Sequence, residues 1–317
     1  FFSDGTSATQ CAVALSRYAT GREAFVSVGY HGGSSPVFGF APQNGGIICD
    51  EDERRSDIAF GFDVWEDWET DNTVPSLFDT SCWIVEVPAV HDEVYAAKWL
   101  RDRWSDFCGR GNPKRRGYFI VDDIVTGFRF APAGALEYYS KLLGETIQAD
   151  FICLGKALST YGKVSALLGP LDVMNALSDK VFASYTFNDH PFGFADALWT
   201  LGEYKKYANR LYENVNITHD SIINLGTILK LGLSDLFREY GFPAKCIGHP
   251  ARSAIVADGD TDVTIASTNG VKLKKLLSRV VDEHDILLHM PQFVTLAHNL
   301  SHVEQTLDAV EKVLKSP

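Results

Sequence analysis

Basic side chains are scarce in this 317-residue sequence: 29 Lys and Arg stand against 41 Asp and Glu, for a formal net charge of −12. Binding to nucleic acid or to an anionic membrane surface needs a basic footprint. The deficit therefore argues against both partners. It does not argue against a phosphorylated cofactor, because a few backbone N–H groups at the start of a helix can hold one phosphate.

Long apolar runs and paired cysteine motifs are also lacking. No uninterrupted apolar stretch is long enough to span a bilayer, and we expect a cytoplasmic protein. The six cysteines show no C-x-x-C spacing and lie mostly in apolar stretches, which favours buried reduced thiols over disulfides or a zinc site. The chain opens without Met, inside an expected strand, so we also expect a segment upstream of it in the full protein.

What the sequence does have is a rhythm of apolar strands, turns and helical stripes, typical of an α/β lobe with a mainly parallel sheet flanked by helices. Strands are predicted at 24–28, 82–87, 118–121, 151–154 and 165–168. Near the C-terminus, strands at 253–257, 286–289 and 293–297 and helices at 270–284 and 302–315 indicate a separate α+β lobe. We expect a large domain over 1–207 and a small domain over 208–317.

Two glycine-containing turns are suited to contact a ligand. The segment SDGTSA, from Ser3, leads into a helix, so that free N–H groups and the positive end of the helix dipole point to one spot. Helix capping by Asp4 or Thr6 is the commoner reason for such residues. The segment YHGG, from Tyr30, follows a strand, where open α/β sheets bind ligands. A half-buried tyrosine at a loop tip fits it equally well.

Two strands end in charged side chains. The run YFIVDDIVTGFR carries apolar residues into Asp122 and Asp123, and a carboxylate buried there needs a cation or strong donors. A protonated pyridine nitrogen or an arginine would serve. The run ADFICLGK ends at Lys156, where desolvation lowers the pKa of an amine and suits it to form imines. A lysine that extends to the rim is the alternative.

A further segment, YTFNDHP from Tyr185, precedes a long helix. Thr186 is a candidate phosphate ligand, and capping before a helix that starts at Pro191 is the alternative. Taken in order, all these segments resemble the class III aminotransferases of pyridoxal 5′-phosphate (PLP) fold type I, closest to the glutamate-1-semialdehyde 2,1-aminomutase branch. The resemblance covers nearly the whole chain and includes TGR at 20–22, DDIVTGFR, LGKALS, TFNDHP, and PQF and LAH near the C-terminus.

The resemblance implies PLP as cofactor and roles for ten residues. Lys156 matches the Schiff-base lysine, and Asp122 the aspartate that keeps the pyridine nitrogen protonated. Tyr30 and Ile124 match the residues on opposite faces of the ring. The remaining matches are His31 beside the tyrosine, Gly5 and Thr6 in the phosphate loop, Glu86 in an E-P segment, His91 where an asparagine usually contacts the cofactor's phenolic oxygen, and Thr186. Thr186 matches a threonine that reaches the neighbouring subunit's cofactor, which implies a homodimer with sites at the subunit interface.

Departures from the family pattern surround the cofactor. Ser7 replaces a glutamate, Asp123 replaces the second acidic residue of an Asp-Glu pair, and STYG at 159–162 replaces a glycine run. No arginine follows Arg279 to hold a substrate carboxylate, which tilts the expectation toward aminomutase-like, amine or amino-sugar substrates; Arg129 and Arg252 stay candidates. We expect PLP-dependent amino-group transfer on a small amine or amino acid. The alternatives are a PLP racemase or decarboxylase, or a catalytically impaired aminotransferase-like binding or regulatory subunit.

Overall fold

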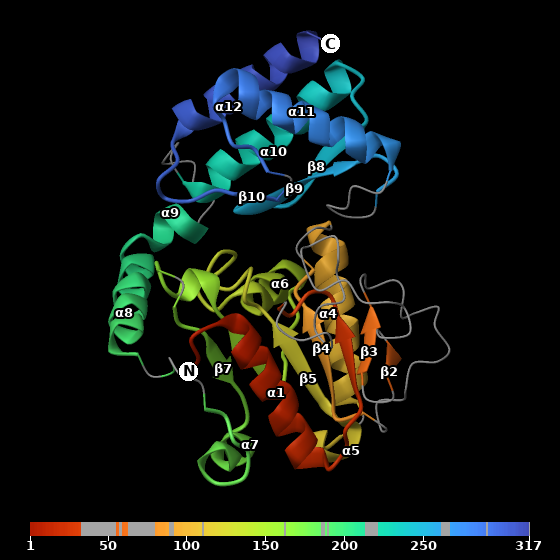
Figure 1. Cartoon of the computed structure of the whole chain (residues 1–317), viewed down its shortest axis with the longest axis vertical. Coiled ribbons are helices and arrows are strands. Elements are labelled where there is room, and N and C mark those ends of the chain that lie inside the picture. The colour runs from red at the N-terminus through yellow and green to blue at the C-terminus, as the bar shows by residue number, and fades with distance from the viewer. Residues whose placement is uncertain are drawn as a thin grey trace. The chain divides into compact units, whose positions relative to one another are not determined.

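The computed structural model describes residues 1–32, 55–56, 59–62, 80–88, 92–109, 111–161, 163–184, 188, 190–212, 221–260, 267–289 and 291–316. The chain folds into two compact units (Figure 1). The first takes in residues 1–87, 97–128 and 133–203, and the second takes in 88–96, 129–132 and 204–317.

The first unit is built on a seven-stranded sheet in the order β2-β3-β1-β4-β5-β6-β7. The strands are β1 (Phe25–Val28), β2 (Arg55–Ser56), β3 (Ala59–Phe62), β4 (Cys82–Glu86), β5 (Tyr118–Asp122), β6 (Phe151–Leu154) and β7 (Ala166–Leu168). The five central strands pair in parallel, and only the two edge strands β2 and β7 run antiparallel. The mainly parallel α/β sheet predicted from the strand-helix rhythm is confirmed.

Helices cover both faces of this sheet, which is why its strands are apolar along their whole length. The helices of this unit are α1 (Gly5–Thr20), α4 (Glu93–Cys108), α5 (Pro113–Arg116), α6 (Ala135–Leu143), α7 (Leu171–Met174) and α8 (Pro191–Lys206), with the 3-10 turns η2 (Lys156–Leu158) and η3 (Asn175–Ser178). Figure 1 shows α1 in front of the sheet and α4 behind it. Alternate residues of β5 serve the two faces: Ile120 packs in the α1 cluster, whereas Phe119 contacts Phe107 of α4 with ring centroids 5.0 Å apart.

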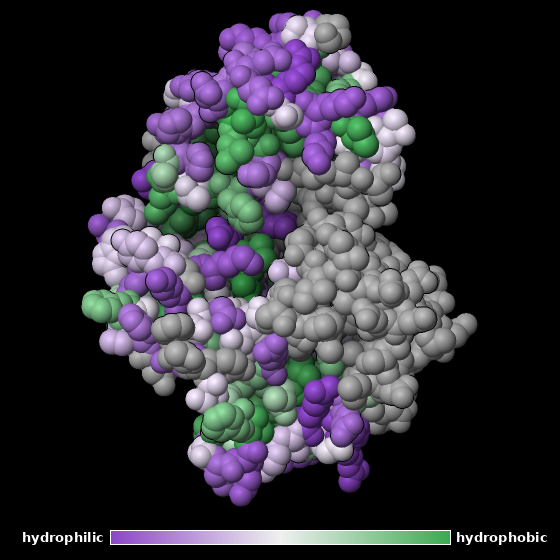
Figure 2. Space-filling view, in the orientation of Figure 1, coloured by the Kyte–Doolittle hydropathy of each residue, from purple (hydrophilic) through white to green (hydrophobic). Residues whose placement is uncertain are grey.

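The second unit is a three-stranded antiparallel sheet with helices on one side (Figure 1). Its strands are β8 (Ala244–His249), β9 (Arg252–Ala257) and β10 (Pro291–Phe293), and its helices are α9 (Ala208–Tyr212), α10 (Ile222–Glu239), α11 (Thr268–His284) and α12 (Leu300–Lys315). Leucine and valine side chains of α10, α11 and α12 form its core. The surface over α11 and α12 is mainly hydrophilic (Figure 2).

One strand expected near the C-terminus is absent, and another is displaced. Residues 286–289 form no strand, and pairing with β9 begins only at Pro291 and ends at Phe293. The runs at 286–289 and 293–297 look alike in the sequence, but only Pro291–Phe293 pairs with β9. Within the described residues no helix is long and apolar enough to cross a membrane.

The predicted burial of the cysteines is confirmed for four of the six. Cys11, Cys82, Cys153 and Cys246 are buried free thiols. Burial raises the pKa of Cys82 to about 12 and that of Cys11 to about 11, so these thiols stay protonated and unreactive at neutral pH.

Candidate functional site

A cavity opens at the edge of the large sheet that is formed by the carboxyl ends of its parallel strands. Most of the predicted site residues lie on it. It has a volume of about 230 Å³ and is lined by Asp4, Gly5, Thr6, Tyr30, His31, Gly32, Asp122, Ile124, Val125, Lys156 and Ser165. We call it the edge cavity. Seven of the ten predicted residues line it. Glu86 lies next to it, while His91 and Thr186 fall outside the described residues.

Parallel strand pairing brings these distant residues together. In the register of the sheet, Glu86 at the end of β4 pairs with Asp122, and Asp122 pairs with Cys153 of β6. The carboxyl ends of β1, β5 and β6 therefore meet at one edge, the place where open α/β sheets bind ligands. Tyr30, Asp122 and Lys156 follow these three strand ends.

Asp122 is held by a histidine rather than by an arginine. One carboxylate oxygen lies 2.8 Å from Nδ1 of His31, and the other accepts the N–H of Ile124 at 3.1 Å. Nε2 of His31 lies 2.9 Å from the carbonyl oxygen of Val28. His31 is 2% exposed, and its two ring nitrogens hold it between the carboxylate of Asp122 and the backbone of β1. The histidine thus fixes the orientation of the buried carboxylate.

Asp123 points away from the edge cavity and has a structural role. Its carboxylate accepts the hydroxyl hydrogen of Thr126 and, at 2.9 Å, the N–H of Ala135 at the start of α6. Complete burial raises the pKa of Asp123 from 3.8 to about 7, against the opposing effect of these two donors. A side chain at Gly134 would collide with this carboxylate. Of the two adjacent aspartates, Asp122 therefore faces the edge cavity and Asp123 anchors the loop before α6.

The raised pKa of Asp123 predicts how stability depends on pH. The carboxyl binds its proton more tightly in the folded chain than in the unfolded chain, so its contribution is complete below about pH 4 and is lost as the pH rises to about 7. A rise from 3.8 to about 7 corresponds to about 4 kcal/mol. Asp123→Asn should remove this dependence, since the amide resembles the neutral acid.

The measurement is the free energy of unfolding in urea at pH 5 and pH 7.5. We expect the wild type to lose stability relative to Asp123→Asn over this interval. Asp282→Asn, at an exposed position on α11, is the matched control and should follow the wild type. Equal pH dependence in wild type and Asp123→Asn would contradict the assignment.

The start of α1 serves both purposes that the sequence suggests. Asp4 caps the helix, because its Oδ1 accepts the N–H of Ser7 at 2.8 Å. The N–H groups of Gly5 and Thr6 have no acceptor among the described residues, and both residues line the edge cavity. Close packing needs glycine here: a Cβ at Gly5 would lie 2.6 Å from Cδ1 of Ile124, and one at Gly32 would lie 2.0 Å from Oγ1 of Thr6.

Lys156 lies where β6 passes into η2, on the lining of the edge cavity. Its φ of 42° falls in the left-handed region, which is strained for a residue with a side chain and is often found at functional sites. The sequence interpretation of a desolvated lysine is wrong for the single chain, where Lys156 is exposed. The buried neighbours are Gly155 and Leu154, so the strand is covered but the lysine at its end is not.

Glu86 supports the edge cavity instead of lining it. Its Oε2 accepts the N–H of Tyr30 at 3.0 Å, which ties the end of β1 to the end of β4. Ile124, 7% exposed, lies against both Gly5 and Gly155. The geometry therefore brings Tyr30 and Ile124 to one cavity, and their placement on opposite faces of a ring stays a prediction.

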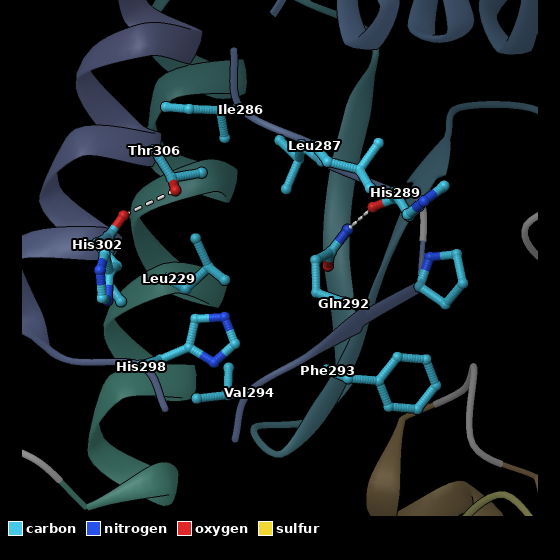
Figure 3. A pocket seen from close by; sticks show the side chains of 13 residues that line it. Leu229, Ile286, Leu287, His289, Gln292, Phe293, Val294, His298, His302 and Thr306 are labelled. Atoms are coloured by element: carbon cyan, nitrogen blue, oxygen red, sulfur yellow. Dashed lines mark hydrogen bonds between the residues drawn. The ribbon is translucent and has the colours of Figure 1, made fainter. Parts of the chain in front are cut away.

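The second unit has a hollow of its own, of about 280 Å³ (Figure 3). Leu229, Ile286 and Val294 give it apolar walls, next to His298 and His302. Nδ1 of His298 accepts the N–H of Thr295 at 3.0 Å, and Nδ1 of His302 accepts that of Asn299 at 3.2 Å. Nδ1 of each ring is thus already used as an acceptor for a backbone N–H.

No group of side chains with the spacing of a metal site occurs within the ranges that the structure describes. The hollow of the second unit also lacks a lysine or a carboxylate on its lining. The edge cavity, with an amine, a carboxylate and free backbone donors, is therefore the candidate active site.

Comparison with known proteins shows what the chain as a whole is similar to. No protein-family model matches the chain. The chain is 26% identical to a glutamate-1-semialdehyde 2,1-aminomutase of Methanothermobacter thermautotrophicus over 338 aligned residues, which cover 99% of this chain and 74% of the relative. It is 29% identical to the enzyme of the same name from Nitrosopumilus maritimus, over 62% of this chain and 45% of the relative.

Solved structures share the fold. The PLP internal aldimine form of the Sphingopyxis sp. MTA144 FumI protein matches 99% of this chain and 69% of its own with a TM-score of 0.69 and 21% identity. An omega-transaminase from Sphaerobacter thermophilus matches 99% and 73% with a TM-score of 0.69 and 18% identity. These comparisons confirm PLP fold type I and the expected resemblance to the class III aminotransferases and aminomutases.

Proposed function

We propose that the chain is a PLP-dependent enzyme of the aminotransferase or aminomutase type, with Lys156 and Asp122 as its catalytic residues. The observation that carries the proposal is the meeting of Asp122 and Lys156, from adjacent strands, with the start of α1 on one cavity. The similarity to two aminomutases supports it. Nothing in the structure favours a racemase, a decarboxylase or a catalytically impaired subunit.

The residues of the edge cavity fit the cofactor. Two N–H groups and a helix dipole at Gly5 and Thr6 suit a phosphate. The carboxylate of Asp122 suits a protonated ring nitrogen, and the apolar Ile124 suits a ring face. The amine of Lys156 suits the aldehyde. When bound, PLP supplies an electron sink for the carbanion left after removal of a proton from the substrate's Cα.

The side chains of the protein orient the cofactor and move the protons. Asp122 holds a proton at the ring nitrogen, and His31 and the N–H of Ile124 fix the orientation of its carboxylate. Lys156 binds the cofactor and, once released from it, moves a proton to and from the substrate carbon, general acid–base work of about 10²–10⁴-fold. Tyr30 and Ile124 confine the ring and exclude water.

Detection of the cofactor tests the proposal. The purified protein, incubated with PLP, should be yellow, and borohydride should fix the cofactor covalently. Peptide mapping should place the adduct on Lys156 and leave the exposed Lys163 unmodified. A colourless protein that gives no adduct after reconstitution would refute the proposal. Analysis of the products with amino acids, diamines and amino sugars would then separate aminotransferase from aminomutase.

The proposal includes a homodimer in the cytoplasm, with small amine or amino-acid substrates. Helix α8 supports the dimer, because Phe192, Leu198 and Trp199 are 79%, 72% and 61% exposed in the single chain. Large apolar side chains gathered on one element are typical of an interface. The predicted contribution of Thr186 to the neighbouring subunit's site would come from the segment just before this helix.

Substitution on α8 should dissociate the dimer. We expect Trp199→Asp to shift the molar mass measured by light scattering after size-exclusion chromatography from that of two chains to that of one. The matched control is Leu231→Asp, at a 54% exposed position on α10, which should stay dimeric. A monomeric wild type, or a dimeric Trp199→Asp, would argue against this interface.

A further inference from the structure

Ser165 lines the edge cavity from a position just before a strand, whereas Asp122 and Lys156 lie at or after the ends of theirs. It directly precedes β7, the antiparallel edge strand, and Ala166 pairs with Leu154 of β6. The start of β7 therefore lies beside the carboxyl ends of β5 and β6. Ser165 stands opposite Gly155, the residue before Lys156, and a Cβ at Gly155 would lie 2.7 Å from its Oγ.

The backbone of Ser165 is held in place, and its hydroxyl has no hydrogen-bond partner among the described residues. The backbone N–H and carbonyl of Ser165 each bond to Phe2 at 2.8 Å, and the residue is 3% exposed. Across the described ranges its Oγ makes no hydrogen bond, while the residue lines the edge cavity. A hydroxyl that faces a cavity and has no protein acceptor is available to donate to a ligand. A ligand that brings an acceptor into the cavity would give it a partner.

The start of α1 is the neighbouring source of donors. The bond between Phe2 and Ser165 holds the chain just three residues before Gly5, and Gly5 and Gly155 both lie against Ile124. The hydroxyl and the N–H groups of Gly5 and Thr6 thus line one cavity. The carboxylate of Asp4 is also there, but it accepts hydrogen bonds from Ser7 and Ser3, at 2.8 to 3.1 Å.

We propose that Ser165 donates its hydroxyl hydrogen to the phosphate group that the start of α1 holds, and so is a further cofactor-binding residue. The inference rests on the proposed function for the identity of the ligand. A hydroxyl donor beside two backbone N–H groups gives the phosphate a partner from a separate strand. Hydrogen bonds to a charged acceptor are the stronger kind.

A comparison of PLP with pyridoxal, which lacks the phosphate, tests the assignment. Ser165→Ala should weaken the equilibrium binding of PLP about 10-fold and leave the binding of pyridoxal unchanged. Ser27→Ala is the matched control, because Ser27 is fully buried on β1 and its hydroxyl also has no partner, yet it does not line the edge cavity. It should bind PLP as the wild type does. An equal loss for PLP and pyridoxal, or no loss for either, would overturn the proposal.

A second measurement keeps this proposal separate from the proposed function. Inorganic phosphate should raise the melting temperature of the wild type without PLP more than that of Ser165→Ala. If the wild type forms no adduct with PLP but shows this phosphate effect, the proposed function fails and the anion-binding role of Ser165 stands. If wild type and Ser165→Ala respond equally to phosphate, the role of Ser165 is refuted even when PLP binds.

Discussion

Asp122→Asn should lower kcat for amino-group transfer by about 10²–10³-fold, the size of effect seen when one preorganised electrostatic partner is removed. An asparagine cannot keep a proton on the ring nitrogen, so the bound cofactor would accept electrons poorly. The Lys156 amine is untouched, and the borohydride adduct should still form. The expected signature is an intact adduct with a much slower half-reaction, measured in a stopped-flow spectrometer.

Two variants separate this effect from damage to the fold. Asp123→Asn changes the adjacent aspartate, whose carboxylate caps α6, and should keep kcat near that of the wild type. His31→Gln removes the imidazole that contacts Asp122 and should lower kcat less than Asp122→Asn does. If Asp122→Asn retained the activity of the wild type, the assignment of Asp122 as the partner of the ring would be wrong.

Five strands of the large sheet, β1 and β4 to β7, were predictable because each is a local apolar pattern, whereas β2 and β3 were not predicted. Apolar runs ending in Asp122 and Lys156, with a glycine at the turn, indicate strand ends at the ligand edge of a parallel sheet. The structure places both residues on that edge. The capping role of Asp4 and the ligand-facing role of Gly5 were posed as alternatives, and the structure combines them in one turn.

Three features of the site could not be predicted in this way, two because they depend on long-range pairing and one because it depends on the exact course of a turn. Ser165 lines the edge cavity because β7 runs antiparallel, so that its first residue and not its last reaches that edge. The partner of Asp122 is His31, 91 positions away in the sequence, and no local spacing identifies it. The split between Asp122 and Asp123 arises from the turn at 124–129, which directs one carboxylate to the edge cavity and the other to α6.

Lys156→Ala should have the largest effect, since it removes both the covalent link to the cofactor and the group that moves the substrate proton. General acid–base catalysis alone contributes about 10²–10⁴-fold, and turnover should fall by at least that factor. Phosphate and ring contacts remain, so PLP should still bind without forming an adduct. The measurement is a single-turnover half-reaction with a preformed complex of PLP and amine, which bypasses the lost link.

A small primary amine in the buffer should restore part of the proton-transfer rate in Lys156→Ala, because the shortened side chain leaves room for it beside Gly155. The matched control is Lys163→Ala, also exposed, which should keep the wild-type rate.

The strained left-handed backbone at Lys156 adds a second readout. Lys156→Gly should bind PLP no more tightly than Lys156→Ala yet fold more stably, since glycine adopts a φ of 42° without strain. Full activity in Lys156→Ala would mean that another amine carries the chemistry.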